Sequence, residues 1–354
     1  MDMITIGVDF HKRTSSYCVM RKDGTVIKRC KMENNTENIV TFLNKINEPK
    51  QVAMEATYGW GLFHDTASPH VDKFLLGHPA KMKLITESES KCDRYDAQTI
   101  SQLATMGFLP QAYAPSKNSR ELRSLVRLRS FLLRQRVAIR NNTHALLDRN
   151  IWQSERPRSF KNIYCDRGKK WMRSLTISPK ERFILDELIS SYERINDQIA
   201  RIEQYINKEA IDLPETQYLR TIPGLRTSKV NIYTILFEID DITRFRKARH
   251  LAKYAGLVPA DNSSGDKQRT GKLVKRANHT LKTAIIESVF AALLVDKGLK
   301  EYFRTVRQRA NPSAAIVACA RKMCYAIYHV LKEQRHYRPF PPAAVSGPLA
   351  TLER

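Results

Sequence analysis

The chain has 354 residues, which at roughly 100 to 200 residues per domain implies two or three domains. Lys and Arg number 60 against 36 for Asp and Glu, so the formal charge is +24, and the hydrophobic fraction of 42% excludes wholesale disorder. An excess of positive charge this large favours a polyanionic partner, and nucleic acid is the first candidate.

Simple counts disfavour a membrane protein and a structural zinc site. The longest apolar stretch, residues 284–295, is interrupted by Glu287 and Ser288, so we expect no membrane span. The first residues lack the basic-then-apolar order of a signal peptide, which predicts a cytoplasmic protein. The six cysteines include no C-x-x-C pair, so reduced thiols are expected rather than bound zinc.

Residues 1–115 alternate between strand and helix patterns. Strands are predicted over 3–8, 16–21, 25–32, 51–54 and 71–76, and helices over 36–46, 61–68 and from about residue 93. Lys22-Asp23-Gly24 stands between the second and third strands, where Asp-Gly indicates a hairpin. The order of three strands, helix, strand, helix, strand, helix predicts an α/β domain.

A helical connector is expected over residues 116–215. Residues 116–152 contain no Gly or Pro and combine a helical apolar stripe with a basic face that includes Arg120, Arg123 and Arg127. The basic face predicts contact with nucleic acid. Residues 179–210 carry Leu and Ile in the rhythm of a coiled coil, which either packs within the chain or mediates self-association.

The remaining sequence predicts a mostly helical domain over 216–340 and an extended or disordered tail over 341–354. The turn Ile222-Pro223-Gly224-Leu225 precedes a helix, an arrangement that can offer backbone amides to a phosphate but is equally common in plain helical hairpins. A polar loop over 259–271 then leads into a basic helix.

Four carboxylates stand where the predicted α/β fold could gather them. Asp9 and Glu55 end the first and fourth strands, and Asp93 and Asp96 share one face of the last helix. Converging carboxylates suit a Mg²⁺ site for phosphoryl transfer, since hard divalent cations prefer oxygen ligands. A solvated surface charge is the alternative for any one of them.

Basic residues surround a small polar segment in the carboxy-terminal domain. Asn262-Ser263-Ser264-Gly265 is followed by cations that would neutralise a phosphodiester: Lys267, Arg269, Lys272, Lys275 and Arg276. Ser-Ser-Gly is also a common turn, so the residues alone leave the role of Ser264 open.

Two blocks of motifs resemble the DEDD transposases of the insertion-sequence 110 family, which are relatives of the Piv DNA invertases. The first block is GVDFHK (7–12), AMEATYGW (53–60), HPAKMK (78–83) and KCDRYDA (91–97). The second is IPGLRTSKVNIYTILFEIDDITRF (222–245) with GLVPADNSSGDKQRTGKLVKRANHTL (256–281). The resemblance covers nearly the whole chain, and the blocks occur in the family's order.

This resemblance implies a ribonuclease-H-like (RuvC-like) domain followed by a helical or coiled-coil connector and a serine-containing transposase domain. It implies Asp9, Glu55, Asp93 and Asp96 as ligands of Mg²⁺ or Mn²⁺, and Ser264 as the nucleophile that forms a covalent phosphoserine with DNA. The expected partners are DNA, a bridging guide RNA and further copies of the chain in a homodimer or homotetramer. The resemblance also implies a cytoplasmic, nucleoid-associated protein.

Two other functions stay open. A metal-dependent nuclease of the Holliday-junction-resolvase kind would use the carboxylates with water as the nucleophile and leave Ser264 as a turn. A non-catalytic nucleic-acid-binding assembly protein would also explain the charge and the basic helix. A covalent protein–DNA adduct separates the first from serine chemistry, and metal-dependent strand breakage excludes the second.

Overall fold

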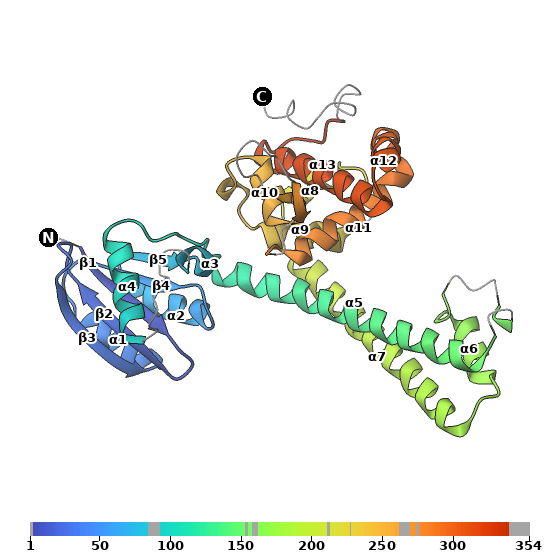
Figure 1. Ribbon diagram of the computed structural model, residues 1–354, viewed down its shortest axis with the longest axis horizontal. Coiled ribbons are helices and arrows are strands. Elements are labelled where there is room, and N and C mark those ends of the chain that lie inside the picture. The colour runs from blue at the N-terminus through green and yellow to red at the C-terminus, as the bar shows by residue number, and fades with distance from the viewer. Residues whose placement is uncertain are drawn as a thin grey trace. The chain divides into compact units, whose positions relative to one another are not determined.

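The computed structural model describes residues 3–83, 93–152, 155–157, 162–210, 213–226, 228–261, 270–273 and 276–339, the side chains of 93–95, 260–261 and 270–273 excepted. The chain divides into two compact units, Met1–Lys117 and Asn118–Arg354 (Figure 1). The first unit corresponds to the predicted α/β segment, and the predicted connector belongs to the same unit as the carboxy-terminal helices.

The first unit is built on a mixed five-stranded sheet. Its strands are β1 (Ile4–Phe10), β2 (Thr14–Met20), β3 (Val26–Glu33), β4 (Lys50–Glu55) and β5 (Lys73–Gly77), in the spatial order β3-β2-β1-β4-β5. The first three strands pair antiparallel, whereas β4 and β5 run parallel to β1. All five predicted strands are confirmed, and the mixed sheet is consistent with a ribonuclease-H-like domain.

The turn between β2 and β3 confirms the predicted hairpin. The amide of Arg21 donates to the carbonyl of Thr25 at 2.9 Å, and Asp23 Oδ1 accepts from the Thr25 amide at 2.9 Å. Gly24 has a φ of +87°, a conformation that costs glycine little because it has no Cβ.

Helices cover both faces of the sheet. α1 (Thr36–Asn44) and α2 (Trp60–Ala67) pack Phe42 and Phe63 against the face that carries Ile6 and Val8. α4 (Asp93–Thr105) lies across the opposite face (Figure 1). A 3-10 turn, η1 (Ser68–His70), and the short helix α3 (Pro79–Met82) complete the unit. The alternation of side chains along each strand supplies an apolar surface to both layers.

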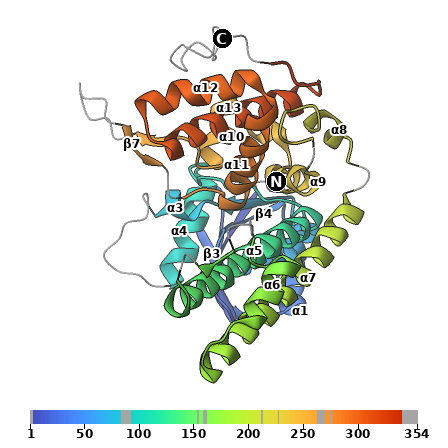
Figure 2. The same ribbon diagram turned by 90° about the vertical axis from the view of Figure 1, so that its right-hand side faces the viewer.

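The second unit begins with two long antiparallel helices, α5 (Lys117–Asn150) and α7 (Pro179–Glu209), which lie side by side (Figure 2). Ion pairs run in opposite order along them, with Arg129–Glu203 at 2.6 Å and Arg149–Glu181 at 3.8 Å. The short helix α6 (Asp166–Ser174) packs at their far end.

Part of the predicted coiled-coil seam is filled within the chain. Leu185, Ile189 and Tyr192 of α7 are buried in one cluster with Leu146 and Leu147 of α5. Intrachain packing, one of the two alternatives for this seam, therefore accounts for these side chains.

The rest of the second unit is mainly helical. Its helices are α8 (Glu215–Leu219), α9 (Lys229–Ile239), η3 (Ile242–Arg244), α10 (Ala248–Tyr254), α11 (His279–Val295), α12 (Lys297–Arg309) and α13 (Pro312–Lys332). Where a polar loop was expected, β6 (Pro259–Asp261) and β7 (Thr270–Leu273) pair antiparallel. Gly224, in the turn before α9, has a φ of +88°, and a Cβ there would lie 2.1 Å from the Ser288 carbonyl oxygen, so close packing requires glycine.

α13 is long and apolar enough to cross a membrane by length and composition alone. Cys319, Cys324 and Ile327 of this helix are fully buried in the core formed with α9, α10 and α11. Packing inside the second unit therefore accounts for its apolar character.

Candidate functional site

Asp9 and Glu55 lie next to each other at one edge of the sheet. Parallel strands β1 and β4 are neighbours in register, and both acids stand at the carboxyl ends of their strands. Alternation puts Asp9 on the face that holds Gly7, and Glu55 on the face that holds Ala53. Both acids therefore point to the side of the sheet that α4 covers.

Gly7 sets how closely α4 approaches this edge. A Cβ at this position would lie 2.2 Å from the Ala97 carbonyl oxygen and 2.3 Å from Ser101 Oγ, so only glycine permits the contact. The buried Ser101 hydroxyl accepts from the Gly7 amide and donates to the Cys18 carbonyl, each at 2.8 Å. These bonds hold α4 against β1 and β2, and Asp96 directly precedes Ala97 on the helix.

Glu55 is influenced by the charges of two neighbouring carboxylates. Burial raises the pKa of Glu55 above its ordinary value of 4.5, and the negative charges of Asp9 and Asp96 raise it further. Asp9 also contacts His11, with Oδ2 lying 2.9 Å from Nε2. Like charges gathered in this way are costly in the absence of a cation and provide hard oxygen ligands for one.

Asp93 begins α4 one turn before Asp96, and its side chain lies outside the described part of the structure. Among the described side chains, no group of three or more His, Cys, Asp or Glu residues is already arranged to hold a metal ion. The donor types still fit Mg²⁺ or Mn²⁺, because carboxylate oxygens are the ligands that these ions prefer.

Glu55→Gln is expected to stabilise the metal-free protein near neutral pH. A raised pKa means that the folded state binds the proton more tightly than the unfolded state, so stability falls as the pH rises from 4.5 through the folded-state value. Glutamine removes that loss. Calorimetry in EDTA should therefore show a higher Tm for the variant at neutral pH and equal Tm values near about pH 3.5. Equal Tm values at both pH values would contradict the charge coupling.

The predicted serine segment, residues 262–276, lies largely outside the described residues. This applies to Ser264, Lys267, Arg269 and Lys275, while Lys272 is described only as a backbone position of β7. Arg276 is described and exposed. β6 precedes the segment and β7 lies within it. α11 follows it with Asn278 as its N-cap, whose Oδ1 accepts from the Leu281 amide at 3.0 Å.

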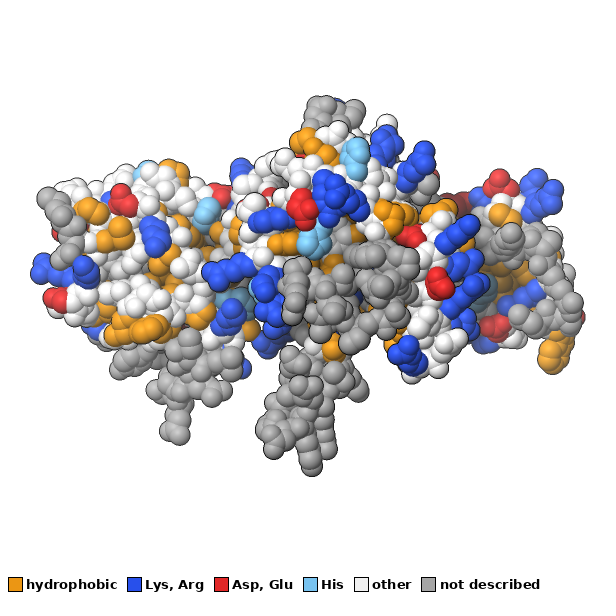
Figure 3. Space-filling view, turned by 90° about the horizontal axis from the view of Figure 1, so that it is seen from above, with side chains coloured by type: hydrophobic (Ala, Val, Ile, Leu, Met, Phe, Trp, Pro, Cys, Tyr) orange, Lys and Arg blue, Asp and Glu red, His pale blue; other side chains and the backbone are white. Residues whose placement is uncertain are grey.

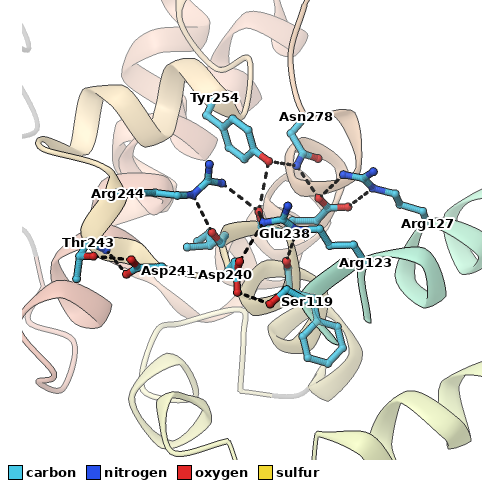
Figure 4. Close-up of polar contacts among 12 residues, drawn as sticks. Ser119, Arg123, Arg127, Glu238, Asp240, Asp241, Thr243, Arg244, Tyr254 and Asn278 are labelled. Carbon is cyan, nitrogen blue, oxygen red and sulfur yellow. Dashed lines mark hydrogen bonds and ion pairs between the residues drawn. The ribbon is translucent and has the colours of Figure 1, made fainter. Parts of the chain in front are cut away.

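Two arginines of the predicted nucleic-acid face of α5 have partners inside the protein. Arg123 is 7% exposed, and its Nε donates to the Phe237 carbonyl at 2.8 Å. Arg127 is about half exposed, but its guanidinium forms two 2.8 Å bonds with the carboxylate of Glu238 (Figure 4). Arg120 is partly exposed. The expected nucleic-acid role of Arg123 is thus corrected, because this side chain stabilises the carboxyl end of α9.

Arg123→Ala is expected to lower the free energy of unfolding by roughly 2 to 4 kcal/mol, since buried carbonyls of α9 lose a charged donor. The salt dependence of DNA binding should not change. Arg134→Ala, at an exposed position of the same helix, is the matched control and should leave stability unaltered. Denaturant unfolding and binding titrations check both. A shallower salt slope at unchanged stability would restore the nucleic-acid role of Arg123.

Glu238 is a buried acid that the sequence patterns did not single out. It is fully buried although it carries a carboxylate, and it binds Arg127 of α5 and Asn278 at the start of α11. A signal was present, because Glu238 is the one acid in the otherwise apolar end of α9, ILFEI (235–239). An acid there requires a buried cation or donor.

Two family models match the chain in succession. A DEDD-type model described as "Transposase" matches residues 6–151, and a model described as "Transposase IS116/IS110/IS902 family" matches residues 216–304. The first covers the carboxylate-bearing sheet and α5, and the second covers α9 to α11, with Glu238, Asn278 and the serine segment.

Known proteins are similar over most of the chain. The transposase for insertion sequence element IS1111A of Coxiella burnetii is 24% identical over 344 residues, covering 95% of this chain and 92% of that protein. The transposase for insertion sequence element IS1328 of Yersinia enterocolitica is 25% identical over 80% of this chain and 81% of that protein. The pilin gene-inverting protein of Moraxella lacunata is 23% identical over 95% of this chain and 98% of that protein.

Proposed function

We propose that this chain, which belongs to the IS116/IS110/IS902 family of DNA transposases and recombinases, cleaves and rejoins DNA through a covalent phosphoserine at Ser264. The carboxylates Asp9, Glu55, Asp93 and Asp96 would hold the divalent metal. The observation that carries the metal site is the placement of Asp9 and Glu55 at neighbouring strand ends, on the face against which Gly7 lets α4 pack with Asp96. In keeping with this, the charges of Asp9 and Asp96 raise the pKa of Glu55.

The carboxylates and the serine have different tasks in this mechanism. A bound Mg²⁺ or Mn²⁺ would stabilise the negative charge that develops on the phosphate oxygens. Ser264 Oγ attacks the phosphorus and loses its proton to a base, so that an Oγ–P bond forms. The bond from phosphorus to the 3′ oxygen breaks, and that oxygen takes up a proton. Attack by a 3′ hydroxyl of another strand reverses these changes and rejoins the DNA.

We further propose that a guide RNA directs the choice of DNA and that the chain works as a homodimer or homotetramer. Figure 3 shows Lys and Arg side chains spread over one face of the described surface. A formal charge of +24 suits two nucleic acids bound together. Sequencing the RNA that co-purifies with the protein tests the guide, since one discrete species is expected.

An apolar groove on the long helices supports the proposed self-association. It has a volume of about 430 Å³ and is lined by Leu125, Leu128 and Leu132 of α5 and by Ile202 and Tyr205 of α7. Leu128 and Tyr205 are both about half exposed. Water-exposed apolar side chains of this kind favour contact with another apolar surface.

The central experiment uses an end-labelled, nicked DNA that traps a covalent intermediate. The purified protein is incubated with it in Mg²⁺ or in EDTA, and the products are separated under denaturing conditions. A metal-dependent protein–DNA adduct is expected. Metal-dependent cleavage without an adduct would identify a water-using nuclease, and binding without cleavage would identify a non-catalytic assembly protein.

A further inference from the structure

Glu238 lies at the centre of a polar network inside the second unit (Figure 4). Its carboxylate is fully buried and accepts two bonds from Arg127, each at 2.8 Å, and one from Asn278 Nδ2 at 2.7 Å. The Arg127 guanidinium comes from α5, and Asn278 precedes α11. The buried charge is therefore compensated by groups from two other parts of the chain.

The same network joins the two flanks of the serine segment. Tyr254 ends α10 before the segment, and Asn278 begins α11 after it. The Asn278 amide donates to the Tyr254 carbonyl at 2.8 Å, and Asn278 Nδ2 donates to Tyr254 Oη at 3.0 Å. Tyr254 Oη in turn donates to the Glu238 carbonyl at 3.4 Å. Both flanks are thus tied to each other and to Glu238.

Two further arginines fix the end of α9 on which Glu238 stands. Arg123 donates to the carbonyls of Phe237 and Glu238, and Arg244 donates to that of Ile239 at 3.1 Å. The Arg244 guanidinium also lies over the ring of Tyr254, 4.6 Å from its centroid. These bonds satisfy the last carbonyls of the helix, so the end of α9 that contacts both flanks is held in one defined geometry.

An ion pair with one fully buried partner, as Glu238 is here, gains little stability, because desolvation of the carboxylate offsets much of its attraction, but it can enforce one arrangement. We propose that Glu238, Tyr254 and Asn278 are positioning residues that set the separation and direction of the two flanks and thereby orient Ser264 for attack. This inference rests on the proposed serine chemistry. In this inference, the three residues position the nucleophile and do not themselves contact DNA.

Asn278→Ser is the sharpest test, because serine caps a helix as well as asparagine does but lacks the amide that reaches Glu238 and Tyr254. We expect the single-turnover rate of adduct formation to fall by about tenfold or more. DNA affinity should stay at the wild-type value. The loss of Tm should be small, since Arg127 still donates two bonds to the Glu238 carboxylate. Asn311→Ser is the matched control, because Asn311 Oδ1 caps α13 at 2.8 Å from the Ala314 amide and lies outside the network. It should change neither rate nor Tm.

Tyr254→Phe removes the hydroxyl and keeps the ring under Arg244. Its rate loss should resemble that of Asn278→Ser, and the double variant should be little slower than either single one, since both break one network. Hydrogen exchange of the peptide covering residues 255–277 should become faster in both variants and not in Asn311→Ser.

Wild-type adduct rates in both variants would overturn the positioning role. A loss of rate accompanied by a large loss of Tm in both would assign the network to fold stability alone and would also overturn it. Failure of the proposed function has a different signature, namely an adduct that persists in Ser264→Ala.

Discussion

Asp96→Asn should reduce DNA cleavage and strand transfer by more than about 100-fold in Mg²⁺. Mutating a residue that only hydrogen-bonds to a metal ligand typically lowers metal affinity or activity about ten- to a hundredfold, and loss of a direct ligand should lower activity further. DNA affinity should stay unchanged, since affinity comes mainly from cationic contacts with phosphates. Asp9→Asn carries the same expectation. Cleavage assays and binding titrations at one salt concentration measure both quantities.

Asp72→Asn is the matched control for these variants. Asp72 Oδ2 accepts from the Lys50 amide at 2.8 Å, at the start of β4 and so at the opposite end of that strand from Glu55. This variant should cleave normally. Asp96→Cys adds a metal-specific test, because a thiolate binds softer ions better than Mg²⁺, so Cd²⁺ should restore part of its activity. Normal cleavage by Asp96→Asn in Mg²⁺ would contradict the metal assignment.

The sheet could be predicted from sequence because each strand is encoded locally. A short apolar run marked β1, Asp23-Gly24 marked the hairpin, and the strand order placed Asp9 and Glu55 at one edge. The approach of α4 had no comparable local signal. It depends on the absence of a Cβ at Gly7 and on the Ser101 hydroxyl, which is 94 residues distant in sequence.

The partners of the basic helix could not be predicted from sequence. Arg123 and Arg127 have the same spacing and composition as residues of a nucleic-acid-binding face, yet their partners on α9 are more than 100 residues away. Periodicity gives the face of a helix on which a residue lies but not what covers that face. The coiled-coil pattern of α7 had the same ambiguity, and α5 fills part of that seam.

Ser264→Ala should eliminate the covalent adduct and recombination while leaving DNA binding intact. Only an oxygen nucleophile at this position can form the phosphoserine, and alanine removes that atom with little change in volume. Ser263→Ala is the matched control, because it makes the same exchange one residue earlier and should have a milder effect. Labelled DNA that remains bound after denaturation, followed by peptide mapping, measures the adduct and its site.

The residue that carries the adduct identifies the nucleophile. Tyr254 Oη already donates to the Glu238 carbonyl and accepts from Asn278, so this phenol is committed to the network and is poorly suited to attack phosphorus. An adduct on Tyr254 would therefore contradict both the serine mechanism and the positioning role of the network. An adduct on Ser263 would shift the nucleophile by one residue. Metal-dependent cleavage with no adduct on any residue would make water the nucleophile and leave Ser264 as part of a turn.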